Sequence, residues 1–194
     1  MLVLGLAPAA HGGNRTGRLF TGDRSGDFLF ASLHRTGFAN QATSAAIDDG
    51  VSLSDLYIAA VVRCAPPDNK PTPAERANCL PYLVRELCLL VRVRVVIALG
   101  SFAWDGAIRA FRDLGFAAAP KPTFRHLAET RIGPFVLLGS YHPSQQNTFT
   151  GRLTPPMLDA AMVRAHELAD VAEPADVAEP ADPDTRRFGA PHSP

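Results

Sequence analysis

Lysine is nearly absent from this 194-residue sequence, in which Lys70 and Lys121 are the two lysines and arginine supplies the other basic residues. Nineteen basic residues balance nineteen acidic ones, so no net positive charge points to a nucleic-acid partner. No apolar run reaches the roughly 18–20 residues of a membrane span, and the N-terminus lacks a signal-peptide pattern. Three cysteines, an odd number, argue against a disulfide framework. These absences predict a cytoplasmic protein that does not enter a membrane.

Apolar runs and helical patterns alternate along the chain. The predicted strands are Leu2–Ala7, Tyr57–Val62, Val93–Gly100 and Phe135–Tyr141. The predicted helices are Ser25–Ala39, Thr72–Leu90, Ser101–Gly115 and Thr154–Asp170. This order predicts one α/β domain over residues 1–169, with three α/β/α layers around a central, mostly parallel four-stranded sheet.

Capping signals place the ends of these helices. Ser25 and Ser101 are each predicted to cap the helix that they begin. Thr72 and Glu75 have the spacing of a capping box. Pro81 is predicted to kink or split the helix that Thr72 begins, because proline removes a backbone donor.

The last part of the sequence differs in composition from the rest. DVAEPA occurs at 170–175 and again at 176–181, and no large apolar side chain interrupts the proline, alanine and acid. Such a composition buries too little surface to offset the entropy of ordering. Residues 170–194 are therefore predicted to be a disordered acidic tail, and an extension without a function is favoured over an interaction tail.

Two loops follow predicted strands, Gly5–Arg18 and His142–Arg152. In an open α/β sheet, ligands bind at the carboxyl ends of the strands. The first loop has glycines for close backbone approach, and Arg15 and Arg18 for phosphate or base, but it fits neither GxGxxG nor a P-loop. The second presents His142 where a general acid or electrophile would lie. The two loops predict a cleft in an enzyme that acts on an anionic compound.

Phe20 and Asp23 follow the first loop, among glycines and just before a predicted helix. Phe20 is either a core residue or an aromatic contact for a ligand, and Asp23 is either a helix cap or a functional carboxylate. Both alternatives stay open at this point.

The cysteines also allow two interpretations. Cys64 and Cys79 are separated by fourteen residues, and the simpler interpretation is that both are buried thiols that pack like small hydrophobes. Cys88 lies in the apolar run ELCLLV, which is typical of a core position. Two cysteines do not complete a zinc or iron–sulfur site, which needs four ligands.

Five sequence blocks carry a resemblance to a known family. They are GLAPAAHGGNRTGR, FTGDRSGD, VVRCAPPDNKPTPAERANC, ALGSFAW and YHPSQQNTFTGRLTPPML. In these blocks, and in their order over about Leu2–Ala169, the chain closely resembles the family 5 (class B) uracil-DNA glycosylases of bacteria and archaea. The resemblance implies a parallel four-stranded sheet between helices. It also implies hydrolysis of the N-glycosidic bond of uracil, hypoxanthine, xanthine and other deaminated bases in DNA, as a step of base-excision repair.

The resemblance also implies roles for individual residues. Phe20 would stack on a base flipped out of the duplex. Asp23 would position water or stabilise the oxocarbenium-like sugar, and Asn69 would place its amide near the base. His142 would donate a hydrogen bond toward the uracil O2. The enzyme is expected to be a monomer. It is also expected to be monofunctional, because no lysine is placed to form a Schiff base.

Two departures from a related family bear on base choice. The family 4 enzymes carry a glutamate at the position of Leu6 and an asparagine at that of Ala60. Ala60 would therefore belong to a less selective base pocket. The residues expected to contact DNA are Arg15, Arg18, Ser144, Gln145, Gln146, Asn147 and Arg152.

The resemblance further implies a [4Fe–4S] cluster held by four cysteines. Cys64 and Cys79 match the later two ligands, whereas the earlier CxxC of the family would precede Leu2. We expect that this CxxC segment is missing from the given sequence, and that the cluster is incomplete or absent here. Two rival functions follow: a non-catalytic damaged-DNA-binding protein that has lost its cluster, or an α/β enzyme that acts on small nucleotides.

Overall fold

Hydrogen bonds join five strands into one sheet in the order β2-β1-β3-β5-β4. The strands are β1 (Leu2–Gly5), β2 (Tyr57–Ala60), β3 (Val95–Leu99), β4 (Glu129–Ile132) and β5 (Phe135–Ser140). Four are parallel, and β4 pairs antiparallel with β5. This computed structural model describes residues 1–171. The predicted tail lies outside that range, apart from its first two residues, which belong to the last helix.

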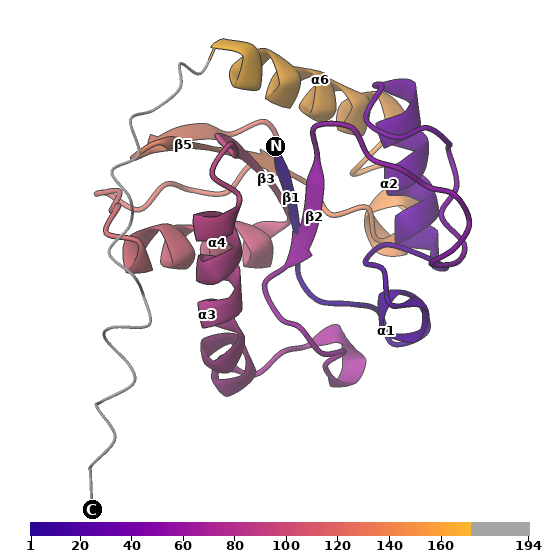
Figure 1. Cartoon of the computed structure of the whole chain (residues 1–194), viewed down its shortest axis with the longest axis horizontal. Helices are drawn as coiled ribbons and strands as arrows, with labels where there is room; N and C mark the ends of the chain where they lie inside the picture. The colour runs from indigo at the N-terminus through magenta and orange to yellow at the C-terminus, as the bar shows by residue number, and fades with distance from the viewer. Residues whose placement is uncertain (172–194) are drawn as a thin grey trace, which may run out of the picture.

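Helices cover both faces of the sheet (Figure 1). The helices are α1 (Gly13–Thr16), α2 (Arg24–Arg35), the 3₁₀ helix η1 (Pro67–Asn69), α3 (Pro73–Leu89), α4 (Ser101–Asp113), α5 (Gln145–Phe149) and α6 (Pro155–Val171). One layer is formed by α3 and α4, which pack together, and the other by α2 and α6. The predicted three-layer α/β/α architecture is confirmed. Up to residue 171, no helix is long and apolar enough to cross a bilayer.

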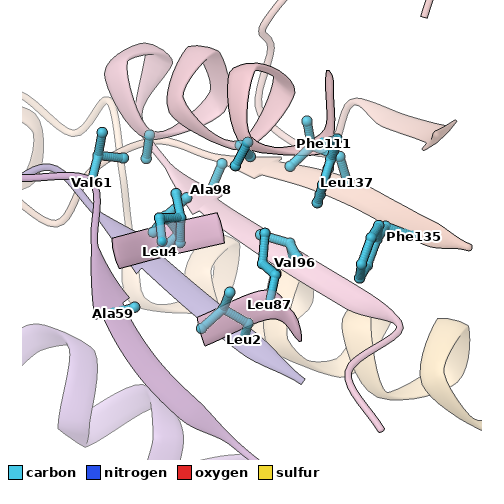
Figure 2. Close-up of a cluster of buried hydrophobic side chains, with 14 of the residues drawn as sticks. Leu2, Leu4, Ala59, Val61, Leu87, Val96, Ala98, Phe111, Phe135 and Leu137 are labelled. Atoms are coloured by element: carbon cyan, nitrogen blue, oxygen red, sulfur yellow. The ribbon is translucent and has the colours of Figure 1, made fainter. Parts of the chain in front are cut away.

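Successive residues of the central strands face different layers. Leu2 and Leu4 of β1 join the core beneath α3 and α4, which also contains Val96 of β3 (Figure 2). Val3 and Ile97 join the second core, beneath α2 and α6. Both faces of β1 and β3 are therefore buried, which explains why these strands are continuous apolar runs rather than alternating ones.

The sheet has one more strand than the sequence predicted. The missed strand, β4, has the sequence ETRI, of which only Ile132 is buried. It lies at the edge of the sheet, and Gly133, with φ of +57°, lies in the short turn that joins it to β5. A short, half-exposed edge strand lacks the apolar run from which the other strands were identified.

Three local predictions also need correction. Asp23, not Ser25, caps α2, and its carboxylate accepts a hydrogen bond from the Gly26 N–H at 2.9 Å. Gly100, whose φ is +94°, stands at the cap of α4 in place of Ser101. Pro81 does not split α3, which continues through it to Leu89. The capping box of Thr72 and Glu75 is confirmed.

Candidate functional site

The two loops singled out in the sequence leave the same edge of the sheet. The parallel strands β1, β3 and β5 lie next to one another, so their carboxyl ends share that edge. The chain passes from β1 to β2 on one side and then to β3 on the other. This reversal makes the carboxyl edge between β1 and β3 the point where α/β sheets bind ligands.

His142, from the loop after β5, leans over the end of β3. A Cβ atom built on Gly100, the residue after β3, would lie 3.4 Å from the His142 Cβ. The imidazole ring of His142 faces the ring of Phe20, with 6.0 Å between the ring centroids and 36° between the planes. The fold thus brings together two residues that are 122 positions apart in the chain.

Phe20 has a left-handed backbone, with φ of +55°, a conformation that bulky residues rarely adopt. Its ring packs over the end of β1, where a Cβ on Gly5 would lie only 2.9 Å from two ring carbons. The side chain is 9% exposed and belongs to the core beneath α2 and α6. The interpretation of Phe20 as a core residue is therefore confirmed, and its ring also faces His142. Its contact with a ligand stays a prediction.

Asp23 begins α2, at the positive end of the helix. One carboxylate oxygen caps the helix through Gly26, and the other lies against Gly12 of the first loop. A Cβ on Gly12 would be 2.1 Å from that second oxygen, so only glycine allows the loop to come so near. The capping interpretation is thus confirmed, while the second oxygen has no hydrogen-bond partner among residues 1–171 and is free to act on a ligand.

His142 is neutral at physiological pH. Burial lowers its pKa to about 4, and the negative charge of Asp23 offsets part of this shift by favouring the protonated ring. His142 as a whole residue is partly exposed, so part of it lies at the surface of this edge of the sheet. Asn147 holds the backbone at this point, since its side-chain amide donates to the His142 carbonyl oxygen at 2.9 Å.

Ser144–Asn147, predicted to bind DNA, form the start of a short helix. Ser144 caps α5 by accepting a hydrogen bond from the Asn147 N–H. Gln145 and Gln146 are exposed on its first turn. Ser144 and Asn147 therefore shape the His142 loop, and the two glutamines are the members of this set whose side chains are free to reach a ligand.

The three predicted DNA-binding arginines have different surroundings. Arg18 is 20% exposed, and its guanidinium bonds Ser44, the Ala46 carbonyl and Asp49 at 2.6–2.9 Å. Arg15 is exposed, and within residues 1–171 its side chain donates to the His11 carbonyl alone. Arg152 is exposed and lies over the ring of Tyr141, with 4.7 Å from the guanidinium carbon to the ring centroid.

Arg18 thus anchors the loop at 44–49 to the first loop. Its ion pair, aided by backbone N–H groups of residues 45, 46 and 51, holds the pKa of Asp49 far below its usual range. Sequence reasoning did not identify Asp49 or Ser44, because no local pattern marks a partner some thirty residues away. A DNA contact by Arg18 remains a prediction, and such a contact would have to compete with these internal bonds.

Ala60 lies in the wall of a cavity of about 290 Å³ beneath the first loop, together with Pro8, Asn14 and Val62. Asn69 is not among the residues that line it. Asn69 is exposed at the end of η1, with a left-handed φ of +54°. The structure therefore brings Ala60 to the first loop but leaves Asn69 on the surface.

Cys64 and Cys79 lie close to each other. The Arg63 N–H donates to the Cys79 sulfur at 3.4 Å, which places that sulfur beside the residue that precedes Cys64. Cys64 is exposed, so the interpretation as a buried thiol does not hold for it, while Cys79 and Cys88 are partly buried. In the part of the chain that the structure describes, no three metal-ligating side chains come together. These residues supply two thiols and not the four ligands of a [4Fe–4S] cluster.

Two aromatic residues near the His142 loop, His126 and Phe149, were not identified from the sequence. His126 stacks on Tyr141, the residue before His142, with 5.2 Å between ring centroids and 19° between planes. The segment 116–132 has no strong periodic pattern, so nothing in the sequence singles out His126. Phe149, 71% exposed at the end of α5, was likewise not identified.

Comparison with known proteins points to one family. A family model described as "Uracil DNA glycosylase superfamily" matches residues 1–165. A type-5 uracil-DNA glycosylase of Mycobacterium bovis is 54% identical over 173 residues, which cover 88% of this chain and 63% of the relative. That of Mycobacterium leprae is 51% identical over 88% of this chain and 74% of the relative. That of Thermus thermophilus is 47% identical over 87% and 75%.

Some of these relatives are longer than the region that matches this chain. The chain spans 63% of the length of the Mycobacterium bovis and Mycobacterium tuberculosis proteins. The matched residues 1–165 include both strand-end loops, and so contain Phe20, Asp23 and His142.

Proposed function

The chain belongs to the uracil DNA glycosylase superfamily, and from this premise we propose that it removes uracil from DNA by hydrolysing the N-glycosidic bond. The observation that carries the proposal is the convergence of Phe20, Asp23 and His142 at the carboxyl edge of the sheet. A stacking surface, a carboxylate and a hydrogen-bond donor are the groups that breaking this bond requires.

In the proposed mechanism the target base leaves the duplex, because its glycosidic bond cannot be reached inside the stack. The ring of Phe20 would supply an apolar surface at the end of β1 for the extruded base. Ala60 would leave the nearby pocket wall without a polar group that selects among bases. The range of substrates would then include hypoxanthine and xanthine as well as uracil.

As the bond breaks, negative charge develops on the base and positive charge on the sugar. The neutral imidazole of His142 would donate an N–H to the base oxygen, and a preorganised donor of this kind contributes roughly 2.7–4 kcal/mol to the transition state. The free oxygen of Asp23 would stabilise the oxocarbenium-like sugar or orient the attacking water. The two groups would thus act on opposite charges of the transition state.

DNA would be held by exposed residues around the cleft rather than by net charge. Arg15, Arg152, Gln145 and Gln146 have side chains available for phosphates. Asn69 is exposed at the end of η1, so it would have to reach toward the base from the surface. A monomeric state and a cytoplasmic location at the nucleoid remain predictions.

We also propose that Cys64 and Cys79 supply two ligands of an iron–sulfur cluster. Their proximity supports this, although residues 1–171 do not complete the ligand set. No step of the mechanism above depends on a cluster. Iron and acid-labile sulfide are measured in the purified parent and in Cys79→Ser, with Cys88→Ser as the matched control. Because residues 1–171 supply two of the four ligands, no stable cluster is expected in any of the three proteins. Residual iron that falls in Cys79→Ser but not in Cys88→Ser supports the proposal, whereas about four iron and four sulfide per chain that persist in Cys79→Ser overturn it.

The proposed activity is tested with a uracil-containing duplex and the same duplex with thymine, each under single-turnover conditions. Release of uracil that leaves an intact strand until alkali is added supports a monofunctional glycosylase. Binding without release would instead support the damaged-DNA-binding protein. Competition by free nucleotides, but not by DNA, would support the small-nucleotide enzyme.

A further inference from the structure

A tight turn before β4 is fastened to the end of β5. The Leu127 N–H donates to the Gly139 carbonyl at 2.7 Å, and the Gly139 N–H donates to the Ala128 carbonyl at 2.9 Å. A Cβ on Gly139 would lie 2.3 Å from the Arg125 carbonyl oxygen, so the turn can approach the strand only at a glycine. Leu127 has a left-handed φ of +58°. The turn is thus held in a strained conformation against Gly139 of β5, which lies two residues before Tyr141.

This turn places His126 beside Tyr141. The two rings stack, and the Nδ1 atom of His126 accepts a hydrogen bond from the Tyr141 N–H at 3.4 Å. The ladder of β5 ends at Ser140, so this side chain continues the hydrogen bonding of the strand by one residue. The next carbonyl, that of His142, accepts from the Asn147 side chain. Two side chains therefore hold the backbone on either side of the His142 α-carbon.

The hydrogen bond to Tyr141 determines the state of the His126 ring. A nitrogen that accepts a hydrogen bond carries no proton, so the neutral ring has its proton on Nε2. Nε2 is buried and has no hydrogen-bond partner within residues 1–171. Burial lowers the pKa of His126, and the backbone of Met157, which favours the protonated ring, offsets part of the shift. An apolar ring would fill the same space without an unpaired N–H, so packing alone does not account for histidine here.

We propose that His126 is a positioning residue that fixes the backbone N–H of Tyr141, the residue before His142, and thereby aims the His142 imidazole at the leaving base. The proposal rests on the proposed function, in which His142 acts on that base. Catalysis depends steeply on such placement, because a displacement of about 1 Å costs about 100-fold in rate. His126 itself contacts Tyr141 and not His142, so its effect on the reaction would be indirect.

The test uses four substitutions that separate the acceptor from the ring. His126→Asn keeps an acceptor near the position of Nδ1, whereas His126→Gln places the same amide near that of Nε2. His126→Phe keeps a flat ring without an acceptor, and His126→Ala removes both. The single-turnover rate of uracil release is expected to stay within about threefold of the parent for Asn, and to fall about 10- to 100-fold for Gln, Phe and Ala. Affinity for the uracil duplex is expected to be unchanged in all four.

The same substitutions are then combined with His142→Ala. If His126 acts through His142, His126→Gln has no further effect on the rate in this background. An equal loss in both backgrounds, or equal rates for Asn and Gln, would indicate a general structural role and overturn the proposal.

A second measurement does not depend on activity. Hydrogen exchange of the Tyr141 amide, followed by NMR, is expected to be faster in His126→Gln than in the parent and parent-like in His126→Asn. Unchanged exchange in both variants overturns the proposal. A parent protein that releases no uracil contradicts the proposed function instead, while the exchange data still report whether His126 holds Tyr141.

Discussion

His142 is expected to titrate more than two pH units below an ordinary histidine. Burial lowers its pKa from 6.5 to about 4, and Asp23 acts in the opposite direction. At pH 7 about one molecule in a thousand then carries a protonated His142. Replacing Asp23 by asparagine is expected to lower the His142 pKa further, because the substitution removes the charge that favours the protonated ring.

This shift links protein stability to pH with a definite sign. The unfolded chain takes up the His142 proton at a higher pH than the folded protein does, so acid favours unfolding. The penalty is absent above about pH 7, grows as the pH falls from about 6.5 to about 4, and levels off below that. A difference of about 2.5 pKa units corresponds to about 3 kcal/mol in full, of which about three quarters is reached at pH 4.5.

The assay compares the parent with His142→Asn, which cannot titrate in this range. Urea unfolding at pH 7 and pH 4.5 is expected to show that the parent loses about 2 kcal/mol more than the variant does. NMR titration of the imidazole resonances, assigned by their absence from the variant, gives the pKa directly. Equal losses in the two proteins, or a His142 resonance that titrates near pH 6, would refute the reasoning.

Four further predictions concern residues at or near the carboxyl edge of the sheet. Asp23→Asn is expected to lower the single-turnover rate with little change in duplex affinity, as measured by fluorescence anisotropy; a parent-like rate would remove Asp23 from the chemistry. Arg152→Ala is expected to weaken binding to damaged and undamaged duplex alike and to reduce the salt slope by about one. Arg18→Ala is expected to lower the melting temperature and leave that slope unchanged, because its guanidinium is bonded internally; the reverse pattern would make Arg18 a DNA contact. Gly26→Ala would place a Cβ 2.1 Å from the Phe20 carbonyl oxygen and is expected to destabilise the protein by about 1–3 kcal/mol in urea unfolding.

The strands that are buried on both faces and the ends of α3 could be predicted from local sequence patterns. Parallel strands under two helical layers need apolar side chains at every position, so β1 and β3 stand out as continuous runs. The capping box of Thr72 and Glu75 depends only on residues three apart, so local spacing is enough to predict it. Strand β4 was not predicted, because buried and exposed side chains alternate only weakly along it. Its place at the edge of the sheet depends on its pairing with β5.

The side chains that meet at the carboxyl edge of the sheet could not be predicted from local patterns. Phe20 and His142 come from loops 122 positions apart, and the order of the strands, not their sequences, brings the two loops to one edge. The same holds for Arg18, whose partners lie on a loop some thirty residues away. It also holds for His126, whose turn can approach the end of β5 because residue 139 is a glycine. Spacing along the chain predicts contacts within a helix or turn, whereas these contacts depend on how the sheet is assembled.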